Sequence, residues 1–251
     1  MITGLDVWEG SLDIDEALLL AEDIKFFAIR INDINGVHHM DVNFTNQWAQ
    51  AVNFLRAPYF VYSPWYTGIE NYNWLKAHLP SGVTKLFIDV EVKKTGYSSE
   101  IYADELQIFI NRCKTDYPLT TIYTGAWFLP IVAHWPTNVD YWWARYPYTL
   151  CPQGDRQTWS WTKWRTVSNT YGYYPDPTKL CPATVGLWQC SGDKLILPGC
   201  ADRPIDLNLF NGNLTSLELW WGTKMPGYTL QERVDILWRE AKERAWNLEK
   251  I

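Results

Sequence analysis

Two acidic residues, Asp89 and Glu91, stand two positions apart in the otherwise hydrophobic segment 86–92. Side chains two positions apart on a β-strand point to the same face, so this spacing places both carboxyls together. Burying such charges costs several kcal/mol unless they are paired or solvated. The pair therefore indicates a functional site. The alternative is an edge strand with a solvated acidic face, or a salt-bridge cluster.

Two further acids lie where they could join this pair. Asp6 lies near the end of the first expected strand, and Asp206 lies on the last one. Catalytic groups of a β/α barrel sit at the C-terminal ends of its strands, and its first and last strands are neighbours. We therefore expect these four carboxyls to lie close together in one pocket at that end of the barrel.

Crowded carboxyls raise one another's pKa, so one of them can stay protonated near neutral pH and act as a general acid. The chain also has 16 Trp, 15 Tyr and 9 Phe, and aromatic faces can stack on sugar rings. Together these features suggest glycoside hydrolysis. A divalent metal site is the competing interpretation, although the Asp-x-Asp-x-Asp spacing of a calcium loop is absent. We expect neither a metal nor another cofactor.

Apolar periodicity predicts strands alternating with helices. The expected strands cover residues 4–8, 26–31, 58–62, 86–92, 119–123, 139–144, 184–190 and 205–209, and the expected helices cover 17–21, 41–55, 71–78 and 101–114. This order is typical of βαβ units around a parallel sheet, repeated often enough to suggest a β/α barrel. Residues 150–182 are expected to form loops or a hairpin, and the last strands lack intervening helices.

The expected domains are a barrel at residues 1–221, a linker at 222–228 and a helical tail at 229–251. The tail opens on Thr229-Leu230-Gln231-Glu232, which has the form of a capping box, and continues with apolar residues at helical spacing. We expect this amphipathic helix to dock on its own domain. The alternative is pairing with a copy of itself or with a partner.

Composition excludes some classes of protein. A formal net charge of −6 argues against nucleic acid as a partner. No run of about 18 apolar residues is present, so we expect no membrane span. The N-terminus lacks the pattern of a secretory signal, which predicts synthesis in the cytoplasm, unless a leader is missing.

Five cysteines fit no compact zinc motif. We expect Cys113 to be a core thiol on a helix. Two disulfides, Cys190–Cys200 and Cys151–Cys181, would form in an oxidising compartment, and free buried thiols are the alternative.

Six short segments, in this order, resemble signatures of the family 25 glycoside hydrolases, the Chalaropsis-type lysozymes or N-acetylmuramidases. They are Gly4-Leu5-Asp6-Val7, Ile88-Asp89-Val90-Glu91, Ile122-Tyr123-Thr124-Gly125, Trp143-Ala144-Arg145-Tyr146, Leu187-Trp188-Gln189 and Ile205-Asp206-Leu207-Asn208-Leu209-Phe210. Residues 31–40 and the Trp-rich segment 159–164 depart from the family's pattern.

The resemblance implies an irregular TIM-like α/β barrel with five βα units and a final group of β-strands. It also implies cleavage of the β-1,4 bond between N-acetylmuramic acid and N-acetylglucosamine in peptidoglycan. Glu91 would be the general acid, Asp89 the second catalytic carboxylate, and Asp6 and Asp206 supporting acids. The implied substrate-binding residues are Tyr62, Tyr123, Trp143, Tyr146, Trp188 and Gln189.

Other functions stay open at this point. A non-catalytic protein that binds cell-wall glycans would use the same aromatic residues, but it would not need four acids at strand ends. A hydrolase of another N-acetylated glycan, such as chitin, would share the chemistry. A wall hydrolase without a leader would suit a phage lysis enzyme, which acts on the bacterial wall after release through a separate pore.

Overall fold

The computed structural model describes residues 1–11, 14–146, 159–160, 178–197, 199–200 and 204–223 of the 251. Its strands are β1 (Ile2–Val7), β2 (Ile24–Arg30), β3 (Leu55–Val61), β4 (Lys85–Asp89), β5 (Leu119–Gly125), β6 (Asp140–Ala144), β7 (Trp159–Ser160), β8 (Val185–Ile196) and β9 (Pro204–Phe210). Its helices are α1 (Glu16–Ala21), α2 (Phe44–Gln50), α3 (Gly68–His78), α4 (Ser99–Asp116), the 3-10 helix η1 (Leu129–Ile131) and α6 (Leu214–Trp221).

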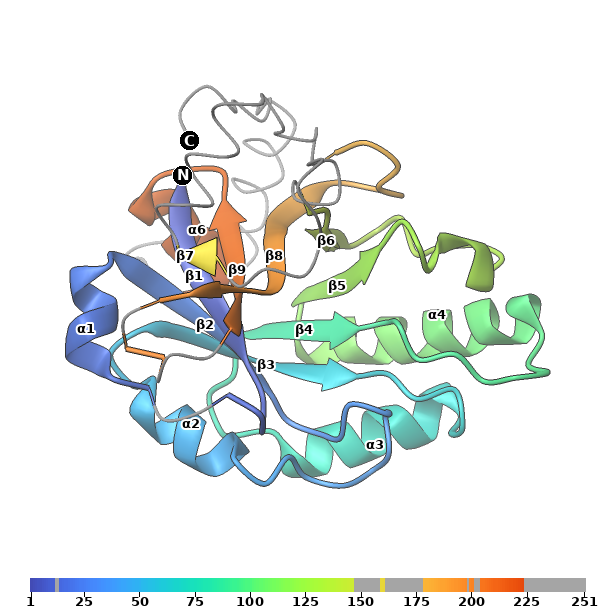
Figure 1. Ribbon diagram of the computed structural model, residues 1–251. Coiled ribbons are helices and arrows are strands. Elements are labelled where there is room, and N and C mark those ends of the chain that lie inside the picture. Colours follow the sequence, from blue (N-terminus) through green and yellow to red (C-terminus); the bar gives the residue numbers. More distant parts are fainter. Residues whose placement is uncertain (12–13, 147–158, 161–177, 198, 201–203, 224–251) are drawn as a thin grey trace.

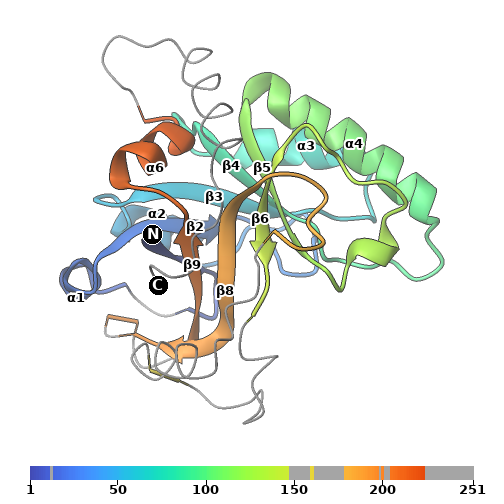
Figure 2. The ribbon, with the colours of Figure 1, turned by 90° about the horizontal axis from the view of Figure 1, so that it is seen from above.

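The sheet closes into a barrel. Strands follow one another in the order β6-β5-β4-β3-β2-β1-β9-β8, and β8 pairs in turn with β6. Strands β1 to β6 and β8 run parallel, whereas β9 is antiparallel to both β1 and β8. Figure 2 shows β6, β8 and β9 side by side where the ring closes. The predicted TIM-like α/β barrel is therefore confirmed, with its last strands joined without helices.

Helices α1 to α4 follow β1 to β4 and lie outside the sheet (Figure 1). Asp15 caps α1 by accepting a hydrogen bond from the Leu18 amide at 3.1 Å, and Thr67 with Glu70 forms a capping box on α3. Between β5 and β6 the chain forms only the one-turn helix η1. The fifth of the implied βα units therefore contains no α-helix.

Helix α2 is shorter than the helix expected over residues 41–55. It begins at Phe44 and ends at Gln50, and β3 already starts at Leu55. Asp41 does not open this helix with a side-chain cap, because both of its carboxylate oxygens are used elsewhere. They accept hydrogen bonds from the backbone amides of Glu9 and Asn43 and from Arg30.

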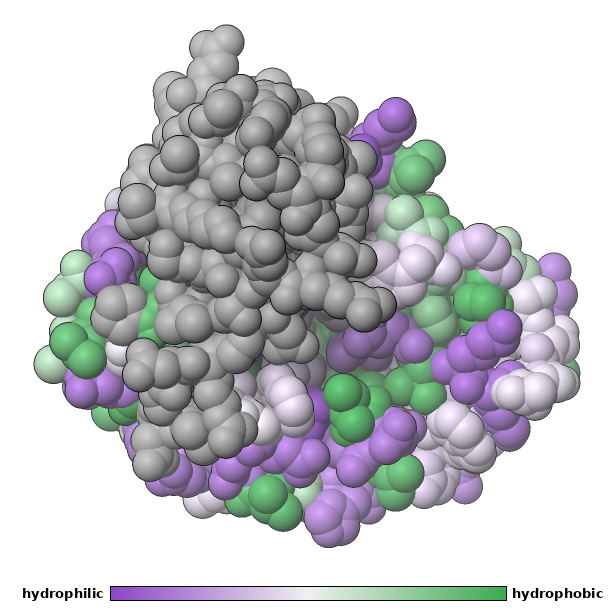
Figure 3. All heavy atoms as spheres, viewed as in Figure 1, coloured by the Kyte–Doolittle hydropathy of each residue, from purple (hydrophilic) through white to green (hydrophobic). Residues whose placement is uncertain are grey.

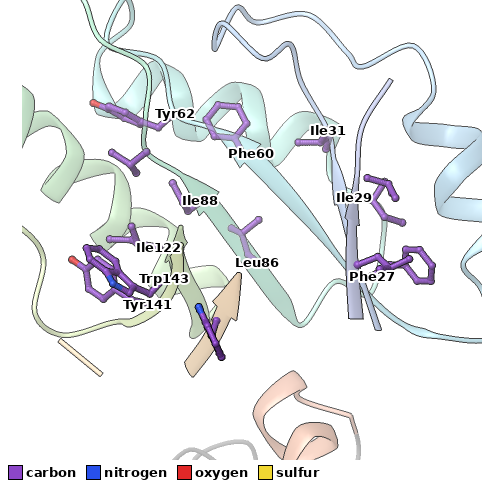
Figure 4. Packing of buried hydrophobic residues seen from close by; sticks show 14 of the residues in the cluster. Phe27, Ile29, Ile31, Phe60, Tyr62, Leu86, Ile88, Ile122, Tyr141 and Trp143 are labelled. Carbon is purple, nitrogen blue, oxygen red and sulfur yellow. The ribbon is translucent and has the colours of Figure 1, made fainter. Parts of the chain in front are cut away.

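Alternation along the strands divides the apolar residues into two layers. The outer layer lies between sheet and helices, and Figure 4 shows it with Leu86, Ile88, Tyr62 and Trp143 among its members. The inner layer fills the barrel and includes Phe87, the neighbour of Leu86. This confirms the predicted separation of the two faces of the acidic strand.

Helix α6 was not expected from the sequence, and it closes one end of the barrel. Trp221 packs on Phe26 and Phe87 with ring centroids 5.1 and 5.5 Å apart, and its Nε1 donates to the Arg56 carbonyl at 3.1 Å. Arg56 lies near the start of β3. The helix therefore closes the end of the barrel where the parallel strands begin. The opposite end, where these strands finish, is left open for a functional site.

The structure tests part of what the sequence predicts for the cysteines and the tail. Cys113 is a buried thiol on α4, as predicted. Cys190 and Cys200 are both free, so the predicted bond between them is wrong; the Cys190 thiol instead points to the Leu207 carbonyl at 3.4 Å. Cys181 is also free, so the predicted Cys151–Cys181 bond is wrong as well. Cys151 itself, most of the linker 222–228 and the tail 229–251 lie outside the described residues, so the tail helix stays a prediction.

On the face shown in Figure 3, hydrophobic residues lie between hydrophilic ones wherever the atoms are not grey. No helix among the described residues is long and apolar enough to cross a membrane.

Candidate active site

A pocket of about 270 Å³ lies at the end of the barrel where the parallel strands finish, and all four predicted acids line it. Asp6 is near the end of β1, Asp89 is the last residue of β4, and Glu91 follows two positions later. Asp206 is near the start of β9 rather than at a strand end. It still reaches the pocket because β9 is antiparallel, so that Asp206 pairs directly with Asp6.

Burial of the acidic pair favours its protonated form. Burial, with a smaller contribution from the negative charge of Asp6, raises the pKa of Glu91 to about 7. The pKa of Asp89, which is only 6% exposed, is also well above its usual value, chiefly through burial and then through Glu91 and Asp6. The pocket can therefore keep a carboxylic acid protonated near neutral pH, as general acid catalysis requires.

Asp6 lies in a network of side-chain hydrogen bonds. Gln189 donates its Nε2 to both oxygens of Asp6 at 3.1 and 3.2 Å, and Asn208 donates its Nδ2 at 2.6 Å. Tyr123 and Tyr146 donate their hydroxyls to Gln189 Oε1 at 2.7 and 2.6 Å. N–H donors stabilise a carboxylate more than the neutral acid, so this network favours ionised Asp6.

A buried cation lines the same pocket. Arg30, at the end of β2, lies 3.0 Å from Asp41 and 3.5 Å from Glu9 through its Nη2. Its guanidinium also stands over the Trp8 ring at 5.1 Å. Its positive charge opposes the rise in the pKa of Asp89. Arg30 thus offsets part of the negative charge that the acids concentrate here.

The rim carries an exposed aromatic platform. Trp127 is 51% exposed and stacks on Tyr146, with ring centroids 6.0 Å apart and planes inclined by 27°. Both rings also line an adjoining pocket of about 340 Å³, together with Arg145. The exposed side chain of Ile34 forms another part of the lining of the acidic pocket. The site is therefore a cleft with apolar rims around a charged floor.

Three of the implied substrate-binding residues do not reach this cleft. Tyr62, Trp143 and Trp188 are fully buried in the outer layer, on the faces of their strands that turn toward the helices. Trp188 Nε1 donates to the Arg145 carbonyl at 2.7 Å. The other three, Tyr123, Tyr146 and Gln189, line the pocket. The structure therefore places three of the six implied substrate-binding residues outside the cleft and three inside it.

Several pocket residues were missed from the sequence: Trp8, Arg30, Ile34, Tyr59, Trp127 and Trp142 line the pocket as well. Alternation would have favoured Trp142 once Trp143 was placed outside, since neighbouring residues of a strand face opposite ways. Arg30 stands in an apolar predicted strand, which is itself a signal of a buried charge with a role. Among the described residues, no group of three or more His, Cys, Asp or Glu is arranged to hold a metal ion.

Comparisons with known proteins agree with this architecture. No protein-family model and no curated protein matches the chain. Among solved structures, the lysozyme of Streptomyces coelicolor is 18% identical, with a TM-score of 0.68 over 89% of this chain and 98% of that chain. A family 25 glycosyl hydrolase from Bacillus anthracis is 20% identical, with a TM-score of 0.62 over 87% and 92%.

The Cpl-1 endolysin, solved in complex with a peptidoglycan analogue, is 15% identical, with a TM-score of 0.53 over 83% of this chain and 53% of that chain. At these identities the similarity concerns the fold, which is that of the family 25 glycosyl hydrolases.

Proposed function

We propose that the protein is a peptidoglycan hydrolase that cleaves the β-1,4 bond between N-acetylmuramic acid and N-acetylglucosamine. The observation that carries the proposal is the meeting of Asp6, Asp89, Glu91 and Asp206 in one open pocket, with the pKa of Glu91 raised to about 7. A fold shared with lysozymes and muramidases supports the choice of substrate. The bacterial cell wall is then the place where the protein acts.

In the proposed mechanism, Glu91 gives its proton to the glycosidic oxygen as the bond from that oxygen to the anomeric carbon breaks. The carbonyl oxygen of the substrate's own N-acetyl group attacks the anomeric carbon and forms an oxazolinium ion. Water then opens this ion and returns a proton to Glu91. Asp89 orients the N-acetyl group; its buried Oδ1 has no hydrogen-bond partner among the described residues and is available for this contact.

An inverting mechanism is the alternative, in which Asp89 activates a water molecule that displaces the leaving sugar directly. The anomeric configuration of the first product distinguishes the two mechanisms. Substrate assistance retains the β configuration, whereas direct displacement gives the α anomer. Proton NMR during the first minutes of the reaction measures which anomer is formed first.

The aromatic rim supplies the sugar contacts of this proposal. Trp127 lines the cleft, is 51% exposed, and stacks on the ring of Tyr146. An aromatic face of this kind stacks on the apolar face of a sugar ring. The adjoining pocket beside Trp127 gives room for a chain longer than one disaccharide.

Glu91→Gln tests the proposal. The variant keeps the shape of the side chain but has no proton to donate, so the rate of wall lysis is expected to fall by about 10²- to 10⁴-fold with the fold intact. Glu100→Gln, the same change on an exposed residue of α4, is the control and keeps the wild-type rate. Turbidity of bacterial walls, with circular dichroism of both variants, gives the measurement.

The alternatives predict different outcomes of this experiment. A non-catalytic wall-binding protein would sediment with walls and release no fragments, and Glu91→Gln would change nothing. A chitin hydrolase would cleave chitin oligomers faster than walls. Mass spectra of the fragments released from purified walls identify the bond, because a muramidase leaves a new reducing end on N-acetylmuramic acid.

A further inference from the structure

The amide of Gln189 has no acceptor capacity left for a substrate. The residue is 2% exposed, and its Oε1 receives two hydroxyl donors, from Tyr123 and Tyr146. A carbonyl oxygen has two lone pairs, so these two bonds saturate it. The two donors also settle which way the amide is turned, because a flipped amide would bring its oxygen against the carboxylate of Asp6. Gln189 is thus committed to holding Asp6.

Asn208 holds Asp6 from a second side, and it is itself fixed from behind. The residue is fully buried, its Nδ2 donates to Asp6 Oδ1 at 2.6 Å, and its Oδ1 accepts from Trp142 Nε1 at 2.6 Å. An indole nitrogen can only donate, so Trp142 forces the oxygen of Asn208 toward itself and the amide nitrogen toward Asp6. The three residues come from β9, β6 and β1.

Ionisable groups approach Asp6 from nearly every strand. Among the described residues they include Arg30 on β2, Tyr59 on β3, Asp89 and Glu91 at β4, Tyr123 on β5, Tyr146 after β6, Cys190 on β8 and Asp206 on β9. Three of them are carboxyls, and any negative charge on these would favour a proton on Asp6. Neutral amides that donate to the carboxylate oppose that effect without adding charge.

We propose that Gln189 and Asn208 form an amide clamp that holds Asp6 ionised and fixed in direction beside Glu91, and that the two are positioning residues rather than substrate-binding ones. Trp142 orients Asn208, and the two tyrosine hydroxyls orient Gln189. The negative charge of Asp6 then keeps the proton on Glu91. The proposal rests on the proposed hydrolase function and replaces the sugar-binding role that the resemblance implied for Gln189.

Asn208→Leu tests the clamp, because leucine fills the same space without donating. Without this donor Asp6 ionises less readily, so Glu91 loses its proton at lower pH. The alkaline limb of the profile of kcat/KM against pH is expected to move down by about one pH unit. We expect kcat on soluble wall fragments to fall about 10- to 100-fold while KM stays within about twofold. Carbon-13 NMR of the Glu91 carboxyl measures the same downward shift of its titration directly, and it does not require an activity assay.

A double-mutant cycle separates the clamp from a general loss of structure. Asp6→Asn by itself should move the alkaline limb down, and Asn208→Leu should add almost nothing in that background, since both act through one charge. Trp142→Phe should move the titration of Glu91 in the same direction. Trp143→Phe, the neighbouring indole on the outer face of β6, is the matched control and leaves the profile unchanged.

The possible results point in distinct directions. A raised KM with an unmoved alkaline limb in Asn208→Leu or in Gln189→Leu would overturn the clamp and leave the hydrolase function standing. An unmoved Glu91 titration in both Asn208→Leu and Trp142→Phe would also overturn it. If the wild type does not cleave walls, the proposed function fails, and the NMR titration still decides on the clamp. Should Asn208→Leu fail to fold, Trp142→Phe carries the test.

Discussion

At the scale of single residues, the proton on Glu91 links chemistry to stability. Its folded-state pKa is about 7, against an ordinary value of 4.5. Between these two pH values the folded chain binds more protons than the unfolded chain, so the free energy of unfolding falls as the pH rises. The stability of the fold is thus reduced, above pH 7, by the same burial that makes Glu91 a general acid.

Glu91→Gln is therefore expected to be more stable than the wild type at pH 8. The expected gain is about 1 to 3 kcal/mol, because a tenfold change in proton affinity corresponds to about 1.4 kcal/mol and Glu91 is partly exposed. Below pH 4.5 both proteins carry a neutral side chain at position 91, and the difference in stability should vanish. Urea denaturation at pH 4 and pH 8 measures it. Equal stabilities at pH 8 would contradict a raised pKa.

At the scale of elements, alternation along the strands decides which side chains can meet a substrate. Neighbouring aromatic residues on a strand therefore face opposite sides of the sheet. Trp142 faces the barrel interior and Trp143 faces the helices, although they are adjacent on β6. Tyr62, directly after β3, packs between Tyr102 and Phe109 of α4 with ring centroids 5.6 and 5.3 Å away. An aromatic residue near a strand end is therefore not by itself part of the groove.

Tyr62→Phe is expected to leave both activity and KM unchanged. The Tyr62 hydroxyl is buried with no hydrogen-bond partner among the described residues, so its removal should keep the stability or raise it by about 1 kcal/mol. Tyr123→Phe is the matched variant. It removes a hydroxyl that holds Gln189, and activity should fall. Loss of wall binding in Tyr62→Phe would return that residue to the substrate groove.

At the scale of the whole molecule, one end of the barrel is packed by helix α6 and the other end carries the acidic pocket. Helix α6 places Trp220 and Trp221 against the inner layer at the end where the parallel strands begin, and Gly222 ends the helix in the left-handed conformation at φ 81°. The acids occupy the opposite end. Substitutions at the α6 end are therefore expected to change stability without changing catalysis.

Trp221→Ala is expected to lower the free energy of unfolding by about 3 to 5 kcal/mol, because it opens a cavity beside Phe26 and Phe87. The folded fraction should retain its activity, since the pocket lies at the other end. Trp65→Ala, at an exposed tryptophan, is the control and should change stability by less than about 1 kcal/mol. A large loss of activity per folded molecule in Trp221→Ala would show that the two ends are coupled.

The sequence alone determined the type and order of most elements and the location of the acids. The alternation of strands and helices and the shared face of Asp89 and Glu91 both follow from local patterns that a few neighbouring residues carry. Helix α6 was not predicted because it has only eight residues, about two turns, so its apolar residues repeat too few times to indicate a helix.

Only the tertiary structure decided which face of each strand turns inward. Periodicity shows which residues share a face, but a displacement of one residue exchanges the two faces, so Trp142 and Trp143 could not be separated from the sequence. The same limit applies to the contacts of Asp6. Gln189 and Asn208 lie 183 and 202 positions away from it along the chain, and they meet it because β9 pairs with both β1 and β8 where the barrel closes.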